Sequence, residues 1–345
     1  MGVVAGGVAL PLAIGLNTAF PTVRITNTDL SSLTAPTHPN QVGLAGIGRN
    51  RDTYPWPTVF SANVTYTAAN AGTTIVDTRF DAEVLFDGTS VATGMTFRRC
   101  WFKGSTNYAM RRLSGAAGGP GITVEDSDFG AYGTEGYLAV AGVAFLYGEN
   151  FFNRCLFHNM EDCFKLKDIH HITDCWLQPV NLPGGHTDCM QYNDADVGKV
   201  YVVRSTLDGR TWSVGGVRCH SQEELGGGAS LIAYGNAVLQ AKPCPPGICT
   251  EPLPTCFYSL QDSIITGGNY IATLNNQNGE FLRNIVIRGS GNPATNLGLR
   301  NSMNTTIPSS GADVNRFHDN SEIYLGGQPN PAGEADPGPI PLLGL

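Results

Sequence analysis

The chain has 345 residues and a formal net charge of −8, and hydrophobic residues make up 41% of it. That apolar fraction is enough for a sizeable core, so general disorder is excluded. Lys and Arg form no cluster, and we therefore expect no binding to nucleic acid, which requires a basic footprint. The apolar N-terminus is broken by Gly and Pro and lacks an early basic residue. We therefore expect neither membrane insertion nor an export signal.

Residues 1–70 lack the repeat that follows and carry Pro and aromatic residues in RDTYPWPTVF (51–60). We interpret residues 1–70 as an N-terminal arm and cap, because the first coil of a solenoid otherwise exposes unpaired strands. The alternative is that this arm attaches the chain to a partner, which its apolar first 20 residues favour.

A repeat occupies residues 71–326. Each copy places a Thr, Cys or Ser between apolar residues, as in TIVDTRF (74–80), TFRRCWF (96–102), TVEDSDF (123–129), FFNRCLF (151–157), HITDCWL (171–177), YVVRSTL (201–207) and SLQDSII (259–265). We call the Thr, Cys or Ser the marker residue. It recurs every 20–31 residues if a degenerate copy is counted at Asn236. Short β-rich units at this spacing, without helical periodicity, predict an all-β solenoid of stacked coils.

The cysteines fall into distinct contexts. Cys100, Cys155 and Cys175 occupy the marker position, so we expect a ladder of buried thiols that points inward. Cys163 and Cys189 share a second context, and Cys244, Cys249 and Cys256 lie in a Pro-rich segment. The sequence leaves open which of these last five cysteines are paired. No CxxC…CxxC or HExxH spacing occurs, so we expect no metal site and no cofactor.

Two neighbouring coils align with each other. MEDCFKLK (160–167) matches HTDCMQYN (186–193) at an offset of 26 residues, and GGVRCHSQ (215–222) continues the match. Strand alternation then sends alternate polar side chains outward. The alignment predicts two outward columns, Lys165–Gln191–Arg218 and Lys167–Asn193–His220, with Asp162 stacked on Asp188 and His186 nearby.

These residue types suit a sugar chain. Lys165, Lys167, Gln191, Asn193, Arg218 and His220 are therefore our candidates for glycan binding. In β-elimination, a Lys, Arg or His removes a proton beside a neutralised uronate, whereas hydrolysis needs two carboxylates that flank the bond. Asp162, Asp188 and His186 are the candidates for such catalysis. The alternatives are that the aspartates are turn residues bonded to backbone amides and that the columns are an ordinary solvated face.

Residues 327–345, GQPNPAGEADPGPIPLLGL, form a Pro/Gly-rich tail with an apolar end. Such a composition favours an extended conformation outside the solenoid. Apolar segments at both ends of the chain favour assembly with other subunits.

Three segments, NRCLFHNMEDCFKLKDIHHITDCWL, GGHTDCMQY and VYVVRSTLDG, resemble the right-handed parallel β-helix proteins of actinobacteria and their phages, a group with tailspike-like and pectate-lyase-like members. That group carries an "EDG" coil, an "HTDG" coil followed by Gln, and a "V-R-HN-I-DG" strand. The sequence departs from it at Cys163 and Cys189, where the group has Gly. The resemblance implies a right-handed parallel β-helix over roughly residues 72–325.

The resemblance also implies two functions. The first is a structural protein of a phage virion, a minor tail protein of tail-fibre or tailspike type whose β-helix contacts host cell-surface glycan. Its partners would be other tail proteins or copies of itself, and its location the virion. The alternative is a polysaccharide lyase or glycoside hydrolase outside the cell. The lack of an export signal and the apolar ends favour the first.

Overall fold

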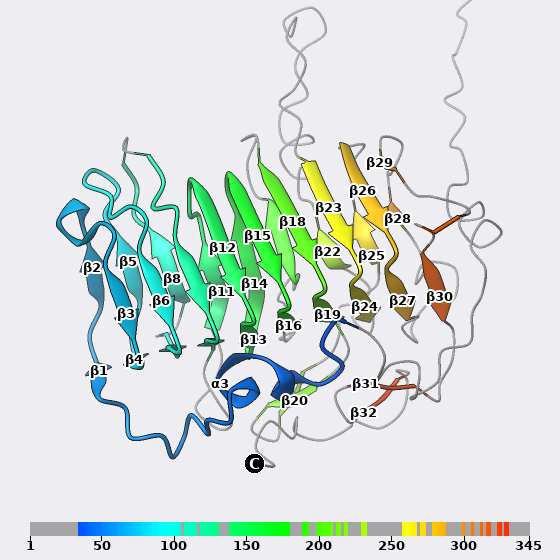
Figure 1. The fold of residues 1–345 in the computed structure, drawn as a ribbon, viewed down its shortest axis with the longest axis horizontal. Helices are drawn as coiled ribbons and strands as arrows, with labels where there is room; N and C mark the ends of the chain where they lie inside the picture. The colour runs from blue at the N-terminus through cyan, green and yellow to red at the C-terminus, as the bar shows by residue number, and fades with distance from the viewer. Residues whose placement is uncertain are drawn as a thin grey trace, which may run out of the picture.

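The computed structural model describes residues 34–104, 107–115, 118–130, 138–179, 188–192, 198–209, 212–214, 217–219, 229–232, 257–267, 270–273, 278–287, 299–300, 305–306, 311–312, 315–318, 323–325 and 328–330. Over these residues the chain forms a right-handed parallel β-helix, and each coil contributes strands to three sheets (Figure 1). This fold confirms the predicted class. No helix among the described residues is long and apolar enough to cross a membrane.

The three sheets consist of parallel strands stacked in chain order. The first sheet contains β1 (Thr58–Phe60), β4 (Thr78–Phe80), β7 (Trp101–Phe102), β10 (Asp128–Phe129), β13 (Leu156–His158), β16 (Trp176–Gln178), β19 (Thr206–Gly209), β24 (Ile264–Gly267), β27 (Ile285–Ile287) and β30 (Arg316–His318). The second contains β2 (Val64–Tyr66), β5 (Val84–Phe86), β8 (Tyr108–Arg112), β11 (Leu138–Ala144), β14 (Met160–Leu166), β17 (Met190–Tyr192), β22 (Ala229–Ile232), β25 (Tyr270–Thr273) and β28 (Leu299–Arg300). The third contains β3 (Thr74–Val76), β6 (Thr96–Arg98), β9 (Thr123–Glu125), β12 (Glu149–Asn153), β15 (Ile169–Thr173), β18 (Lys199–Val203), β23 (Phe257–Gln261), β26 (Asn278–Leu282) and β29 (Thr305–Thr306).

The remaining elements are short. The antiparallel hairpins β20 (Trp212–Val214)/β21 (Val217–Cys219) and β31 (Ile323–Leu325)/β32 (Gln328–Asn330) lie outside the three sheets. Before and within the first coil come η1 (Pro39–Gln41), α3 (Gly43–Gly46) and η2 (Ala68–Asn70).

The marker residues form a ladder through the turn between the third and first sheets. The backbone N–H of Cys100 donates to Ser127 Oγ at 3.0 Å, and that of Cys155 donates to Cys175 Sγ at 3.3 Å. The backbone N–H of Cys175 in turn donates to Ser205 Oγ at 3.0 Å. The three cysteines are fully buried free thiols, which confirms the predicted inward ladder. Burial raises the pKa of Cys100 to about 12. Cys163 and Cys189 are buried free thiols as well, and Cys244, Cys249 and Cys256 lie outside the described residues.

An aromatic column fills the core beside this ladder. The side chains of Phe80, Phe102, Phe129 and Phe157 point inward from the first sheet and stack, with ring centroids 5.1, 4.5 and 4.4 Å apart. Because parallel strands in register place equivalent side chains above one another, one apolar residue per coil is enough to make a continuous core.

The solenoid begins at Thr58, before the predicted start at residue 71, because β1 pairs with β4 and β2 pairs with β5. These first strands lack the marker pattern and are paired on one side only within the described residues. Their weaker burial explains why the repeat does not extend to them in the sequence. At the other end the β31/β32 hairpin spans the predicted boundary between residues 326 and 327, and the rest of the predicted tail lies outside the described residues.

The marker ladder passes directly from Ser205 to Ser263. The backbone N–H of Ser205 donates to Ser263 Oγ, 58 residues later, at 3.1 Å. One long coil therefore spans this interval, and it contributes β22 to the second sheet and the β20/β21 hairpin outside the sheets. Asn236 itself lies outside the described residues. The predicted coil length of 20–31 residues holds for the other intervals that this ladder joins, but not here.

Residues 34–57, which we call the strap, run along the outside of the first sheet (Figure 1). The hydroxyl of Thr206 donates to the carbonyl of Pro36, and the N–H of Gly43 donates to the carbonyl of Arg154 at 2.8 Å. Farther along the strap, Arg49 forms an ion pair with Asp77. The strap thus crosses successive coils along their sides and does not cover the end of the solenoid as a cap would.

Candidate functional site

The second sheet brings together four of the residues proposed from the sequence. Lys165 on β14 is the register partner of Gln191 on β17, and Lys165 Nζ donates to Gln191 Oε1 at 3.0 Å. The N–H of Asp188 donates to Asp162 Oδ1 at 2.8 Å. Lys165 Nζ also lies 2.8 Å from Asp162 Oδ2. The predicted offset of 26 residues between these coils is confirmed.

This cluster is buried. Asp162 and Asp188 have no exposed surface, and the side chain of Lys165 is 14% exposed. Burial raises the pKa of Asp162 well above its usual value, and the neighbouring Asp188 charge adds to the effect. Burial alone would lower the pKa of Lys165, but the charge and hydrogen bond of Asp162, together with the charge of Glu161, outweigh burial and raise that pKa. Gln191 and Lys167 are buried too, so the described residues of the two columns are not an ordinary solvated face, and glycan binding by them stays a prediction.

The proposed third member of the first column is in another place. Gln191 on β17 is followed in the sheet by Ile232 on β22, not by Arg218. Arg218 belongs to β21, which pairs antiparallel with β20. The physical reason is visible in the sequence, since Gly215-Gly216 between the two strands suits a two-residue hairpin turn. His186, Asn193 and His220 lie outside the described residues.

The buried position of Asp162 and Asp188 limits the reactions that these carboxyl groups could catalyse. A hydrolase needs two carboxyl groups that reach opposite sides of a bound glycosidic bond. Asp162 uses one oxygen to accept the Asp188 amide and the other to contact Lys165. These bonds join two consecutive coils, so Asp162 accepts a backbone amide as the alternative interpretation expects, although it lies within β14 and not in a turn. Among the described residues, no group of three or more His, Cys, Asp or Glu could hold a metal ion.

The third sheet carries an aromatic row that sequence reasoning missed. Phe151, His171 and Tyr201 are register partners on β12, β15 and β18 and point away from the core. The ring centroids of Phe151 and His171 are 4.6 Å apart, and those of His171 and Tyr201 are 4.9 Å apart. The signal was available, because each ring lies four residues before the marker residue of its coil.

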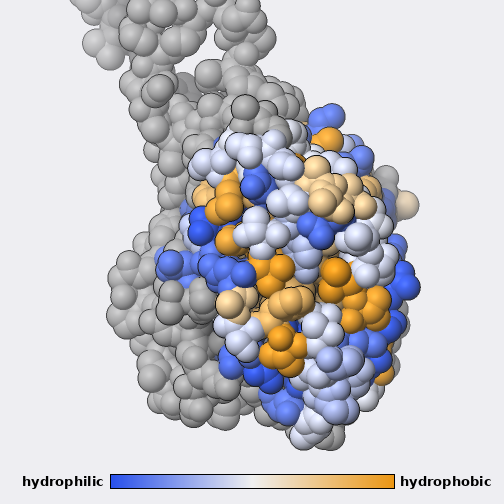
Figure 2. All heavy atoms as spheres, turned by 90° about the vertical axis from the view of Figure 1, so that its left-hand side faces the viewer, coloured by the Kyte–Doolittle hydropathy of each residue, from blue (hydrophilic) through white to orange (hydrophobic). Residues whose placement is uncertain are grey.

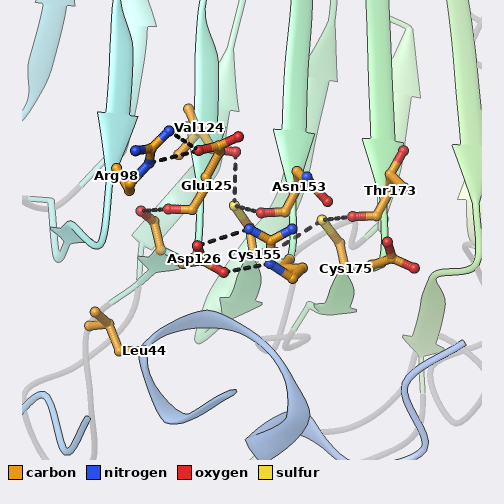
Figure 3. A network of polar contacts seen from close by, with 12 residues as sticks. Leu44, Arg98, Val124, Glu125, Asp126, Asn153, Cys155, Thr173 and Cys175 are labelled. Atoms are coloured by element: carbon orange, nitrogen blue, oxygen red, sulfur yellow. Dashed lines mark hydrogen bonds and ion pairs between the residues drawn. The ribbon is translucent and has the colours of Figure 1, made fainter. Parts of the chain in front are cut away.

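The turn beside the marker ladder carries alternating charges. Nε and Nη2 of Arg154 donate to the carboxylate of Asp126 (labelled in Figure 3) at 2.6 and 2.9 Å. Arg204 binds Asp174 in the same way at 2.7 and 2.8 Å. These four residues have φ between 46 and 54°, where a non-glycine residue is uncommon. The paired fork geometry of arginine and carboxylate holds them in this conformation.

A polar cluster joins the strap to the first sheet. Arg51 of the strap lies 2.9 Å from Asp128 Oδ2 and 2.6 Å from His158 Nε2, and all three residues are buried. The N–H of Leu44 donates to Asp128 Oδ1 at 2.9 Å. Burial and the Arg51 charge hold the pKa of His158 well below its usual value. His158 is therefore neutral, and its Nε2 accepts from Arg51.

The first coil forms an open end. β1, β2 and β3 each begin their sheet, and no described residue pairs with their outer side. Phe60, Val64 and Ile75 are only partly buried there. Figure 2 shows this end, with orange apolar side chains gathered on it. Unpaired strand edges and exposed apolar side chains together are features of an interaction surface.

Comparison with known proteins gives no family assignment. No family model matches the sequence, and no curated protein matches it. Among solved structures, the chain is similar to QnrB1, a plasmid-mediated fluoroquinolone resistance protein, with a TM-score of 0.29 and 10% sequence identity over 72% of this chain and 88% of that one. The strand pairing of this chain, and not that similarity, defines its fold.

Proposed function

We propose that the chain is a structural protein of a phage virion, a minor tail protein of an actinobacterial phage whose β-helix contacts host cell-surface glycan. Its location is then the virion, and its partner at the first coil is another tail protein or a second copy of itself. The phage and actinobacterial parts of the proposal rest on the sequence motifs. The proposed attachment to another subunit rests on the open first coil of the solenoid.

The observation that carries the proposal is the open first coil. Natural proteins protect strand edges with a cap, a bulge or a charge, because a free edge pairs with other chains. Here the strap, which could have covered the edge, binds to the side of the first sheet instead. An edge left open by the described part of its own chain fits a subunit that docks end-on.

The alternative enzyme gains no support from the candidate catalytic residues. Asp162 and Asp188 are fully buried, and Asp162 accepts the N–H of Asp188 and contacts Lys165. A glycan would have to reach carboxyl groups that hold two coils together. The geometry of these residues fits a role in holding consecutive coils together.

The proposal is tested by mass spectrometry of particles purified from the phage that encodes the chain. We expect the chain at a fixed copy number relative to the major tail protein after gradient purification. A non-structural protein of the same phage serves as the control, because it should be lost in the gradient. Presence in the infected lysate and absence from purified particles would contradict the proposal.

A further inference from the structure

Phe151 is a large apolar side chain on the outer face of a sheet, and 40% of it is exposed. One face of its ring is covered by His171, whose plane is tilted from it by only 7°. The imidazole is held in place by Glu149, whose Oε1 lies 2.8 Å from His171 Nε2. The covered face of Phe151 is therefore rigidly supported.

The other face of Phe151 looks along the solenoid axis over small side chains. β12 lies between β15 and β9, and the register partner of Phe151 on β9 is Thr123. Thr96 and Thr74 continue this column toward the first coil. All three threonines are partly or fully exposed. The aromatic row thus ends at Phe151, and we call the surface beside this residue the step. Its wall is the free ring face of Phe151. Its floor is the column of Thr123, Thr96 and Thr74, which we call the threonine lane.

A charge pair borders the threonine lane. Arg98 and Glu125 lie two residues along their strands from Thr96 and Thr123, on the same outer face, and Arg98 lies 2.7–2.8 Å from Glu125 Oε2. Figure 3 shows these two side chains pointing toward each other. The side chain of Arg98 is 45% exposed, so guanidinium donors remain open to solvent beside the lane. The step therefore combines an apolar wall with hydroxyl, guanidinium and carboxylate groups.

We propose that this step binds one pyranose unit of a neutral glycan, with the C–H face of the sugar against Phe151 and its hydroxyl groups toward the threonines and the Arg98–Glu125 pair. A pyranose has an apolar face and a polar rim, and the step offers an apolar ring face next to polar groups. Neutral sugar is favoured because the charges that border the lane neutralise each other. This inference locates the glycan contact of the proposed function and in that respect rests on it.

Four variants separate the step from the rest of the row. Phe151→Leu removes the wall, and Thr123→Phe fills the floor with a ring that stacks on Phe151 and extends the row. Both are expected to weaken binding by up to about tenfold, since a favourable ring contact contributes at most about that factor. Thr123→Phe should not destabilise the fold, because it adds an aromatic pair within a sheet. Tyr201→Leu and Val59→Ala are the controls, since Tyr201 lies behind His171 and Val59 is exposed on the first sheet.

The test is isothermal titration and saturation-transfer NMR of the purified full chain with maltohexaose, laminarihexaose, mannohexaose and soluble arabinogalactan, with hexagalacturonate as the acidic probe. We expect binding of at least one neutral probe by the wild type, by Tyr201→Leu and by Val59→Ala, and weaker binding of that probe by Phe151→Leu and Thr123→Phe. Three results would overturn the inference: no neutral probe binds, only the acidic probe binds, or Thr123→Phe binds as the wild type does. The assay uses no virion, so its failure would leave attachment to a tail untouched, and absence from particles would leave the binding result standing.

Discussion

His170 is an ionisable side chain inside the apolar core. It lies between Phe152 and Phe164 and has no exposed surface. Among the described residues, neither ring nitrogen has a hydrogen-bond partner. Burial, with a smaller effect from His171, lowers the pKa of His170 to about 3. The imidazole is thus neutral in the folded chain at any pH near 7.

This burial makes stability depend on pH. The unfolded chain takes up a proton at His170 below pH 6.5, whereas the folded chain does so only near pH 3. His170 therefore does not lower the free energy of unfolding above pH 6.5. As the pH falls from 6.5 toward 3, this residue lowers the free energy of unfolding by up to about 1.4 kcal/mol per pH unit.

We expect His170→Phe to remove this loss, so that the free energy of unfolding of the variant exceeds that of the wild type by a margin that grows from pH 7 to pH 4.5. Urea unfolding at several pH values measures the margin. Ile172→Val, an inward neighbour without charge, should lower stability by about 1 kcal/mol at every pH. Equal pH dependence in His170→Phe and the wild type would show that the imidazole is not buried.

At the scale of elements, a buried ion pair joins the strap to the first sheet. Arg51 is 4% exposed and Asp128 is 2% exposed, and Asp128 also accepts the N–H of Leu44. Burial raises the pKa of Asp128, although the charge of Arg51 acts to lower it. The charged form of the carboxylate therefore depends on Arg51 for its stability. Removal of one member of such a pair leaves an uncompensated buried charge.

We therefore expect Arg51→Met to destabilise the docked strap by about 3 kcal/mol or more. Amide hydrogen exchange of Gly43 and Leu44, which donate to Arg154 and Asp128, reports this directly. The double variant Arg51→Met/Asp128→Asn should restore much of the protection, because the amide can still accept from Leu44 without a charge. Unchanged exchange in the single variant would mean that the strap is held by other contacts.

Some of these elements can be predicted from the sequence, and others cannot. The marker residues predicted the coils because one small inward residue per turn is a periodic requirement of the fold, and Lys165 over Gln191 follows from the equal length of two consecutive coils. Arg218 broke the pattern because its strand, β21, pairs antiparallel with β20 outside the three sheets. The burial of His158 was not predictable, since it depends on a strap more than 100 residues away in sequence.

For the molecule as a whole, the open first coil is the feature on which the proposed function depends. β2 and β3 offer the outer edges of two sheets, and Thr65 and Thr74 on them are exposed. A lysine on an edge strand discourages pairing with another chain, because its charge would be brought against the neighbour. An edge that docks in the virion should therefore not tolerate lysine, whereas the isolated protein should.

Incorporation of Thr65→Lys/Thr74→Lys into phage particles tests this claim most directly. The matched control is Ser114→Lys/Gly118→Lys, which adds the same charges at exposed positions between β8 and β9. We expect both variants to unfold within about 1 kcal/mol of the wild type, as surface substitutions usually do. Only the control should enter particles at the wild-type copy number. Equal incorporation of the edge variant and the control would contradict end-on attachment through the first coil.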